Sequence, residues 1–167
     1  MSPDASQFQS AAHPARFEPE EFFTGFLKAS GMFVDRFGTV QRRFVADIQC
    51  EPHEDGFSLH ESFLFDDGLR EERVWHISRQ ADNAFRGTCA DVAGHASGTL
   101  KGPALQWRYD FYLDIYGKRV KVRFDDLMVQ QSSGVVLNRA KVRKFGLLLG
   151  ELFITFHRAD AATDKAA

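Results

Sequence analysis

The segment from residue 57 to 79 alternates large apolar and polar side chains, and one short turn sequence divides it into two arms. A period of two is typical of a β-strand that buries one face. The two arms therefore predict a β-hairpin. The apolar positions that would share its buried face are Phe57, Leu59, Phe63 and Phe65 in the first arm and Trp75 and Ile77 in the second.

The turn between the arms sets their register. The sequence Asp66-Asp67-Gly68 suits a three-residue turn that ends with Gly68 at positive φ. This turn places Glu61 opposite Arg73, whereas a two-residue turn would shift the register by one and separate the two apolar faces. We therefore predict a carboxylate and a guanidinium directly across from each other on the inner face. An unpaired inward charge would cost several kcal/mol, so we expect an ion pair.

Residues 105 to 128 predict a second hairpin, with alternating arms joined by a two-residue Tyr116-Gly117 loop. This register points a second acid, Asp126, inward beside Trp107. It also pairs Tyr109 with Phe124 on the same face. In the strand expected from residue 40 to 48, Arg42 interrupts an apolar face in a similar way.

Together with these two hairpins, the chain predicts about ten strands, nearly all joined by short turns that permit only antiparallel neighbours. Pro19-Glu20-Glu21 predicts a short helical turn, followed by a first strand from residue 22 to 34. The glycine-rich stretch from 85 to 96 fits two bent strands better than a helix. The last hairpin turns at Phe145-Gly146, with the inner face of its strands left open. A closed up-and-down barrel is the favoured fold, because closure removes exposed edges, and an open sandwich is the alternative.

Length and composition limit the other possibilities. The 167 residues predict one domain from 16 to 159, between disordered tails at 1–15 and 160–167. A net charge of -2 gives no reason to expect nucleic-acid binding. The sequence contains no apolar run of the roughly 18 residues needed to span a membrane and no export signal, so we expect a cytoplasmic protein. The spacing of its cysteine and histidine residues predicts neither a metal site nor a cofactor.

The motifs whose spacing is distinctive are Gly25-x-Leu27-x-Ala29-x-Gly31, Asp35-Arg36-x-Gly38, Arg43-Phe44, Leu59-x-Glu61-x-Phe63-x-Phe65-Asp66-Asp67-Gly68, Arg73-x-Trp75, Gly87-Thr88-x-Ala90-Asp91-Val92-x-Gly94, Trp107-x-Tyr109, Asp125-Asp126-x-Met128, Asn138-Arg139 and Lys144-Phe145-Gly146. This set resembles the bacterial family known as domain of unknown function 3833 (DUF3833), over residues 17 to 158. The resemblance implies a lipocalin-like (calycin) barrel, but the family has no established activity. Relatives are often encoded near fatty-acid-modifying enzymes, which implies a lipid-like ligand and a lipid-modifying partner. Leu127 departs from the family pattern, where Trp is common.

Inward charges among aromatic residues make the interior the candidate ligand site. An arginine in a barrel could bind the carboxylate of a fatty acid while aromatic walls hold the tail. A closed ion-pair network in a filled barrel is the structural alternative. A small isomerase or lyase is another, with Asp126, Glu61 or His95 as proton carrier. The predicted ligand-binding residues are Arg42, Glu61, Arg73, Trp75, Trp107, Tyr109, Phe124 and Asp126.

Overall fold

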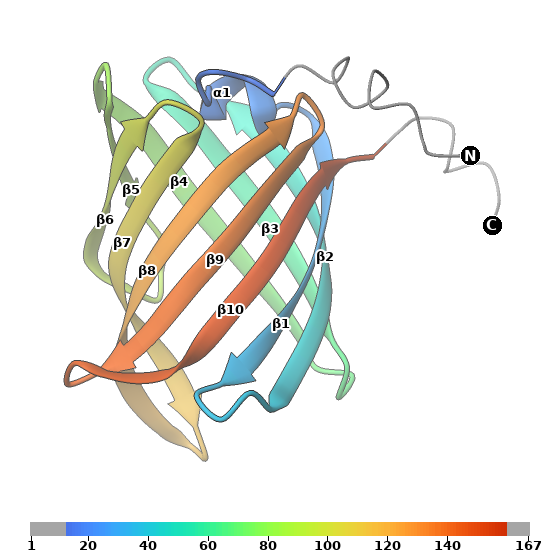
Figure 1. The fold of residues 1–167 in the computed structure, drawn as a ribbon, viewed down its shortest axis with the longest axis vertical. Helices are drawn as coiled ribbons and strands as arrows, with labels where there is room; N and C mark the ends of the chain where they lie inside the picture. Colours follow the sequence, from blue (N-terminus) through green and yellow to red (C-terminus); the bar gives the residue numbers. More distant parts are fainter. Residues whose placement is uncertain (1–12, 160–167) are drawn as a thin grey trace, which may run out of the picture.

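The chain closes into a barrel of ten antiparallel strands (Figure 1). A computed structural model describes residues 13–159, and the predictions for residues 1–12 and 160–167 lie outside this range. Each strand pairs with its neighbours in sequence, and β1 closes the ring against β10. The predicted up-and-down barrel is therefore confirmed. The elements are α1 (Pro19–Phe22), β1 (Phe26–Asp35), β2 (Val40–Pro52), β3 (Gly56–Phe65), β4 (Arg70–Ala81), β5 (Ala84–Thr88), β6 (Val92–Lys101), β7 (Ala104–Ile115), β8 (Lys118–Ser132), β9 (Val135–Lys144) and β10 (Leu147–Arg158).

The hairpin of β3 and β4 has the predicted register. Glu61 is the Cα partner of Arg73, and the apolar pairs on either side follow as expected. Gly68 ends the turn at φ +85°, a conformation that a side chain rarely adopts. The β7–β8 hairpin pairs Trp107 with Asp126, also as predicted. The turn chemistry was therefore sufficient to fix which side chains enter the barrel.

The structure also answers the questions that the sequence left open about the glycine-rich stretch and the inner face of β9. The glycine-rich stretch forms β5 and β6, with a register shift between Ala93 and Ser97. In β9 the alternation of exposure points Asn138 inward. The first strand begins at Phe26, later than predicted, because Phe22 and Phe23 are buried in the cap at the end of the barrel. Gly25 then turns the chain into β1 at φ +73°.

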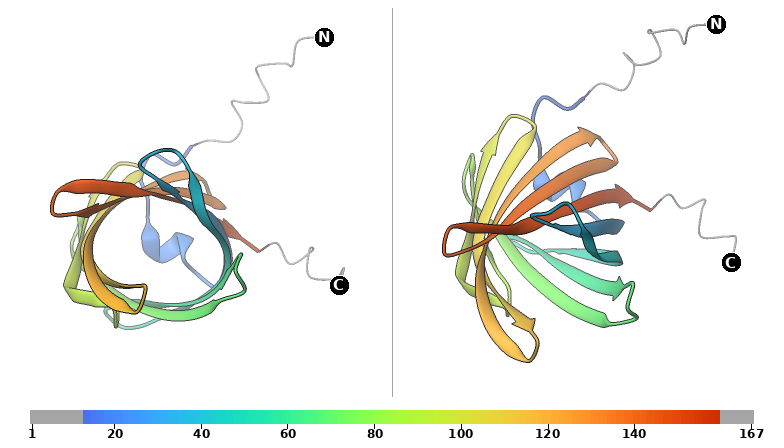
Figure 2. Two further views of the ribbon diagram at one scale, coloured as in Figure 1. Left: turned by 90° about the horizontal axis from the view of Figure 1, so that it is seen from below. Right: turned by 60° about the horizontal axis from the view of Figure 1, so that its bottom comes forward.

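The segment around α1 covers one end of the barrel. Viewed from the opposite end, α1 lies across the bore (Figure 2). Arg79 holds this segment from the barrel wall, because its Nε and Nη2 lie 2.8 Å from Glu20 Oε1 and Glu18 Oε2. Arg158 donates to the backbone oxygens of Glu21 and Phe22 at 2.6 and 2.7 Å. These charge-assisted hydrogen bonds fix the cap to strands β4 and β10.

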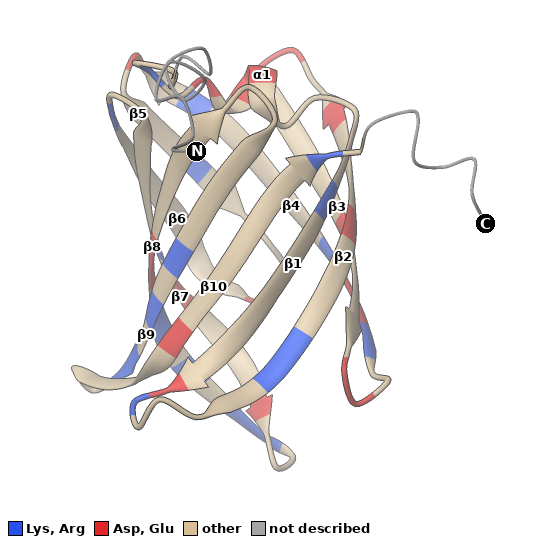
Figure 3. Cartoon of the chain, turned by 45° about the vertical axis from the view of Figure 1, so that its right-hand side comes forward, with Lys and Arg blue, Asp and Glu red and all other residues tan. Residues whose placement is uncertain are grey.

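The outer wall carries most of the charged side chains, many of them in pairs between adjacent strands. Arg123 Nε lies 2.8 Å from Asp110 Oδ1, and Lys28 Nζ lies 3.2 Å from Asp47 Oδ1. Charged positions are sparse along β1 and β10 (Figure 3). Among the residues described, no helix is both long enough and apolar enough to cross a membrane.

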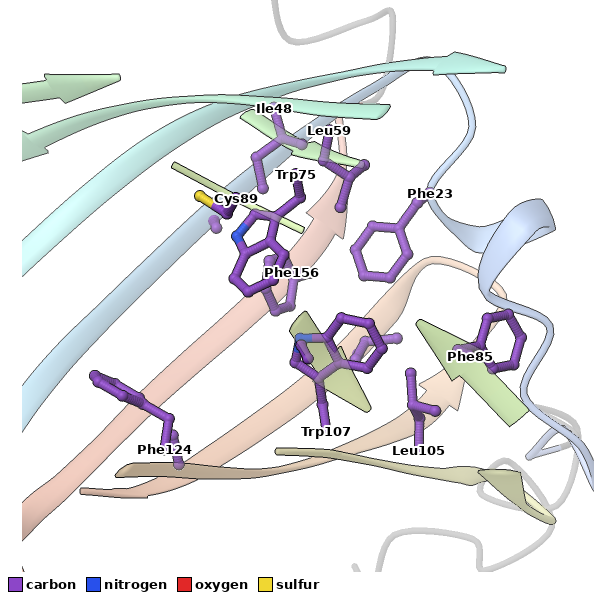
Figure 4. Packing of buried hydrophobic residues seen from close by; sticks show 14 of the residues in the cluster. Phe23, Ile48, Leu59, Trp75, Phe85, Cys89, Leu105, Trp107, Phe124 and Phe156 are labelled. Atoms are coloured by element: carbon purple, nitrogen blue, oxygen red, sulfur yellow. The ribbon is translucent and has the colours of Figure 1, made fainter. Parts of the chain in front are cut away.

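Tight packing fills the capped half of the barrel. The ring of Phe23 lies 5.5 Å from that of Phe156, and Trp107 is only 4% exposed (Figure 4). Gly87 and Gly98 make room for the indole, since a Cβ at either position would stand 2.4 or 2.6 Å from a Trp107 ring atom. The glycines of β5 and β6 are therefore required by the large side chain opposite them.

Candidate ligand-binding site

The uncovered half of the barrel is open to solvent, in contrast to the capped half. Inward side chains near this mouth keep accessible surface, and solvent reaches inward as far as Glu61, which is 8% exposed. Tyr109 also keeps some accessible surface although it lies deep in the barrel. The barrel is thus filled at one end and accessible at the other. The partly exposed inward side chains are Phe33, Phe63, Phe65, Arg73, Leu113, Val120 and Leu152.

The predicted ion pair between Glu61 and Arg73 does not form, because Arg73 pairs with a different acid, Glu71. Their backbones are directly opposite, but Arg73 Nη2 lies 3.0 Å from Glu71 Oε2. Arg73 also lies over the rings of Phe63 and Phe111, at 5.0 and 4.8 Å from their centroids. The long arginine side chain extends toward the mouth, where Glu71 retains more contact with water than Glu61 does. This leaves Glu61 facing the lumen.

Arg42 lies at the mouth, although its parity is inward as predicted. Its Nη2 is 3.6 Å from Asp67 Oδ2 in the β3–β4 turn, and its guanidinium stacks 3.4 Å above the Phe65 ring centroid. Its side chain is 34% exposed. Both inward arginines that the sequence singled out therefore already have a carboxylate partner.

Asp126 and Asn138 form a buried polar pair on adjacent strands. Each is 4% exposed, and Asn138 Nδ2 donates to Asp126 Oδ2 at 3.3 Å. The remaining carboxylate oxygen of Asp126, Oδ1, and the amide oxygen of Asn138, Oδ1, are both buried with no hydrogen-bond partner. Such atoms are rare in native proteins and each needs an explanation. The sequence analysis missed Asn138 because the inner face of β9 was ambiguous; the register of β9 against β8 was the missing information.

Burial controls the chemistry of both inward acids. It raises the pKa of Glu61 to about 7, against the opposing charge of Arg73. It also raises the pKa of Asp126 to about 7, although the Asn138 amide favours the ionised form. Burial raises the pKa of the Tyr109 hydroxyl well above its usual value. The site therefore contains two carboxyl groups that change protonation state near neutral pH.

Aromatic rings surround these acids. Tyr109 stacks on Phe124 with ring centroids 5.1 Å apart, and the Trp75 ring meets it edge-on at 5.2 Å. Trp75 and Trp107 are 5.9 Å apart, and Phe111 extends the cluster toward the mouth. The structure brings these predicted aromatic residues together inside the barrel, from β4 on one side of the short strands β5 and β6 and from β7 and β8 on the other. Sequence analysis did not include Phe111, although its odd-numbered position on the same strand was the available signal.

His95 is not part of this cluster. It is exposed, in the part of β6 where the pairing with β7 shifts register. The irregularity breaks the alternation on which a prediction of its direction depended. The structure therefore separates His95 from the two acids proposed beside it as proton carriers.

Comparison with known families identifies the chain. The model of a family described as a protein of unknown function, DUF3833, matches residues 2–158. The chain belongs to the DUF3833 family. No curated protein matches its sequence.

Solved structures resemble this DUF3833 barrel in fold. The S-type phycobiliprotein lyase CPES from Guillardia theta superposes with a TM-score of 0.66 at 9% identity, over 95% of this chain and 99% of that one. A redesigned β-barrel, mFAP1, bound to DFHBI gives a TM-score of 0.47 at 8% identity, over 85% and 100% of the two chains. At this identity the lyase shows a shared fold only.

A second hollow of the DUF3833 barrel lies on its outer wall. This groove of about 830 Å³ crosses β2, β1, β10, β9 and β8, and is lined mostly by outward side chains. Leu137 and Phe153 contribute apolar surface, and Arg43 and Arg139 contribute charge. It contains neither Glu61 nor Asp126, although Asn138, which is 4% exposed, belongs to its lining. The groove is therefore a competing location that any binding experiment must separate from the lumen.

Proposed function

We propose that this protein binds a small, largely apolar molecule in the open half of its barrel. The observation that carries this proposal is the buried pair of Asp126 and Asn138, whose Oδ1 atoms have no partner on the inner face that also carries the aromatic residues Trp107 and Tyr109. A pocket with apolar walls and a few convergent polar groups is typical of small-molecule sites. The likeness of the fold to a phycobiliprotein lyase supports a role in handling a small ligand.

We further propose a hydrophobic ligand of fatty-acyl type. Its chain would extend from the aromatic wall of Tyr109 and Phe124 toward the mouth, past Leu113 and Leu152. These side chains are apolar, and the two leucines are partly exposed. Covering them would remove apolar surface from water, at roughly 25 cal/mol per Å². A lipid-modifying enzyme is the proposed partner that would deliver or receive such a ligand.

Fluorescence titration with N-phenylnaphthylamine, a neutral apolar probe, tests the lumen directly. We expect saturable binding with an energy-transfer signal from Trp75 and Trp107, because both indoles lie inside the barrel. Native mass spectrometry of protein purified from its own host, followed by lipid extraction, should then identify a bound amphiphile.

Two tryptophan substitutions separate the lumen from the outer groove. Leu152→Trp adds bulk on the inner face and should weaken probe binding at least about tenfold, the equivalent of 1.4 kcal/mol. Leu137→Trp adds the same bulk on the outer face, where Leu137 is 44% exposed, and should leave binding unchanged. Loss of binding in Leu137→Trp alone would place the ligand in the groove and overturn the proposal.

Proton transfer is a second candidate function, favoured by the pKa values of Glu61 and Asp126 near 7. A general acid or base works best when its pKa is close to the working pH. An isomerase or lyase acting on a fatty-acyl substrate would begin by removing a proton next to a carbonyl group. Exchange of the α-protons of a medium-chain acyl thioester in deuterium oxide tests this function. It should be catalysed by the wild type and lost in Asp126→Asn; equal exchange in both would exclude Asp126.

A further inference from the structure

We infer that the ligand presents a hydrogen-bond donor, an amine, amide or hydroxyl group, rather than a carboxylate, to the inner end of the lumen. This inference rests on the proposed function and adds the chemical class of the ligand's polar group. It differs from the sequence-based expectation of an arginine gripping a fatty-acid anion. Three independent features of the lumen support it.

The first feature is the pair of oxygens without donors. Asp126 Oδ1 and Asn138 Oδ1 are both acceptors, and both are buried without a partner. A buried polar atom left unsatisfied costs about 1 to 3 kcal/mol, which a ligand donor would recover. These oxygens have almost no open surface, and the Tyr109 hydroxyl lies close enough to Asp126 to lower the pKa of that acid. A ligand donor therefore reaches them when the Tyr109 side chain rotates and the donor takes the place of its hydroxyl. Rotamer changes of this kind are common when ligands or partners bind.

The second feature is the balance of charge inside the barrel. Glu61, Glu71 and Asp126 all point inward, and Arg73 is the cation placed among them. Tyr109 and the Cys89 thiol are the other titratable groups near this cluster, and Asp125 lies on the outer face of the same strand. An additional carboxylate would meet like charges at short range. A donor or cation would meet complementary ones.

The third feature is that both inward arginines are engaged. Arg73 pairs with Glu71 at 3.0 Å, and Arg42 pairs with Asp67 at 3.6 Å. A ligand carboxylate would have to displace one of these partners. Arg42 is also at the mouth, whereas the unpartnered oxygens of Asp126 and Asn138 lie deeper. An acid held by Arg42 would leave the inner acceptors unsatisfied.

Four ligands with the same twelve-carbon chain provide the test: dodecylamine, dodecanamide, dodecanol and dodecanoate. Displacement of N-phenylnaphthylamine by each ligand is measured at pH 8, below the micelle concentration of the amine and the carboxylate and below the solubility limit of the amide and the alcohol. We expect the amine and amide to bind at least tenfold more tightly than dodecanoate, with the alcohol between. Amine binding should strengthen as the pH rises from 6 to 8, because Asp126 and Glu61 ionise over that interval while the amine stays charged.

Matched variants show which residues cause the preference for donor ligands over dodecanoate. Asn138→Leu removes the acceptor oxygen and keeps a side chain of similar size. It should reduce the ratio of dodecanamide affinity to dodecanoate affinity at least fivefold. Arg42→Met removes the guanidinium at the mouth and should leave that ratio unchanged. If Asn138→Leu fails to fold, Asp126→Asn replaces it, and it should remove the pH dependence of amine binding.

The outcomes distinguish this inference from the proposed function. Dodecanoate binding as tightly as the amine, or weakening specifically in Arg42→Met, would overturn the inference while leaving a lumen ligand in place. If none of the four ligands displaces the probe and the probe itself does not bind, the proposed function fails. An amine preference that disappears in Leu137→Trp and persists in Asn138→Leu would move the donor site to the outer groove and overturn both.

Discussion

Glu61 and Arg73 are direct cross-strand neighbours on the inner face of the barrel, yet the Arg73 guanidinium forms its ion pair with Glu71. The result is a carboxyl group that is buried and lacks the partner its register provides. Burial outweighs the attraction of Arg73 and raises the pKa of Glu61 to about 7. Burial raises the pKa of Asp126 to about 7 as well, so the lumen combines two such acids with aromatic walls.

Stability should fall as the pH rises from about 5 to about 7. The pKa values of Glu61 and Asp126 are about 7 in the folded protein, against ordinary values of 4.5 and 3.8. The folded state therefore binds more protons than the unfolded state in this interval, so the free energy of unfolding decreases with pH. Each acid contributes on the order of 3 kcal/mol to this change. Urea unfolding between pH 5 and 8.5 measures it.

Comparison with Asp126→Asn isolates the contribution of Asp126 to the pH dependence of stability from that of the other titratable residues, such as histidine. The variant should have a flatter pH dependence and a higher free energy of unfolding than the wild type at pH 8, because it cannot acquire a buried charge. Glu61→Gln should behave similarly. Wild-type stability that rises with pH to the same extent as in the variant would show that Asp126 is ionised at low pH.

Arg73→Met should raise the pKa of Glu61 further. The positive charge of Arg73 now lowers that pKa, and methionine keeps most of the apolar stem. Carbon NMR titration of the Glu61 side-chain carboxyl group gives the direction of the change. Glu71→Gln is the matched control, since it frees Arg73 while retaining its charge, and it should not raise the Glu61 pKa. A Glu61 titration unchanged by Arg73→Met would mean that the two groups do not interact across the lumen.

Gly87→Ala should destabilise the barrel by about 1 to 3 kcal/mol, because its Cβ would stand 2.4 Å from a Trp107 ring atom. The forced shift of the indole should also change tryptophan fluorescence. Gly134→Ala is the control, since a Cβ there meets no atom within 4 Å. Equal midpoints of thermal unfolding in the two variants would contradict the packing of Trp107 described here.

Arg79→Met should loosen the cap over the filled end of the barrel. The substitution removes ion pairs of 2.8 Å to Glu18 and Glu20, and we expect a loss of about 1 to 3 kcal/mol. Hydrogen exchange at the Phe22 and Phe23 amides, which bond to Glu18 O and Pro19 O, should accelerate. Arg86→Met, at an exposed position on β5, should change neither. Unchanged exchange in Arg79→Met would show that apolar burial alone holds the cap.

The sequence predicted the barrel through local rules that act between near neighbours. Alternation assigned each side chain to a face, and the turns at Gly68 and Gly117 set the register of two hairpins. These rules placed Glu61 and Asp126 inside correctly. They did not apply at His95, where β6 shifts register against β7, and they left the face of Asn138 undecided.

The sequence by itself determined which residues of the β3–β4 and β7–β8 hairpins point into the barrel, because side chains alternate between the two faces of a strand and short turns set the register. Only the tertiary structure decided which of those residues meet. The partner of Arg73 depends on how far a long side chain extends in three dimensions, and the pairing of Asp126 with Asn138 depends on the register of β9 against β8. The filled and open ends likewise follow from where the segment around α1 packs, a contact between parts of the chain distant in sequence.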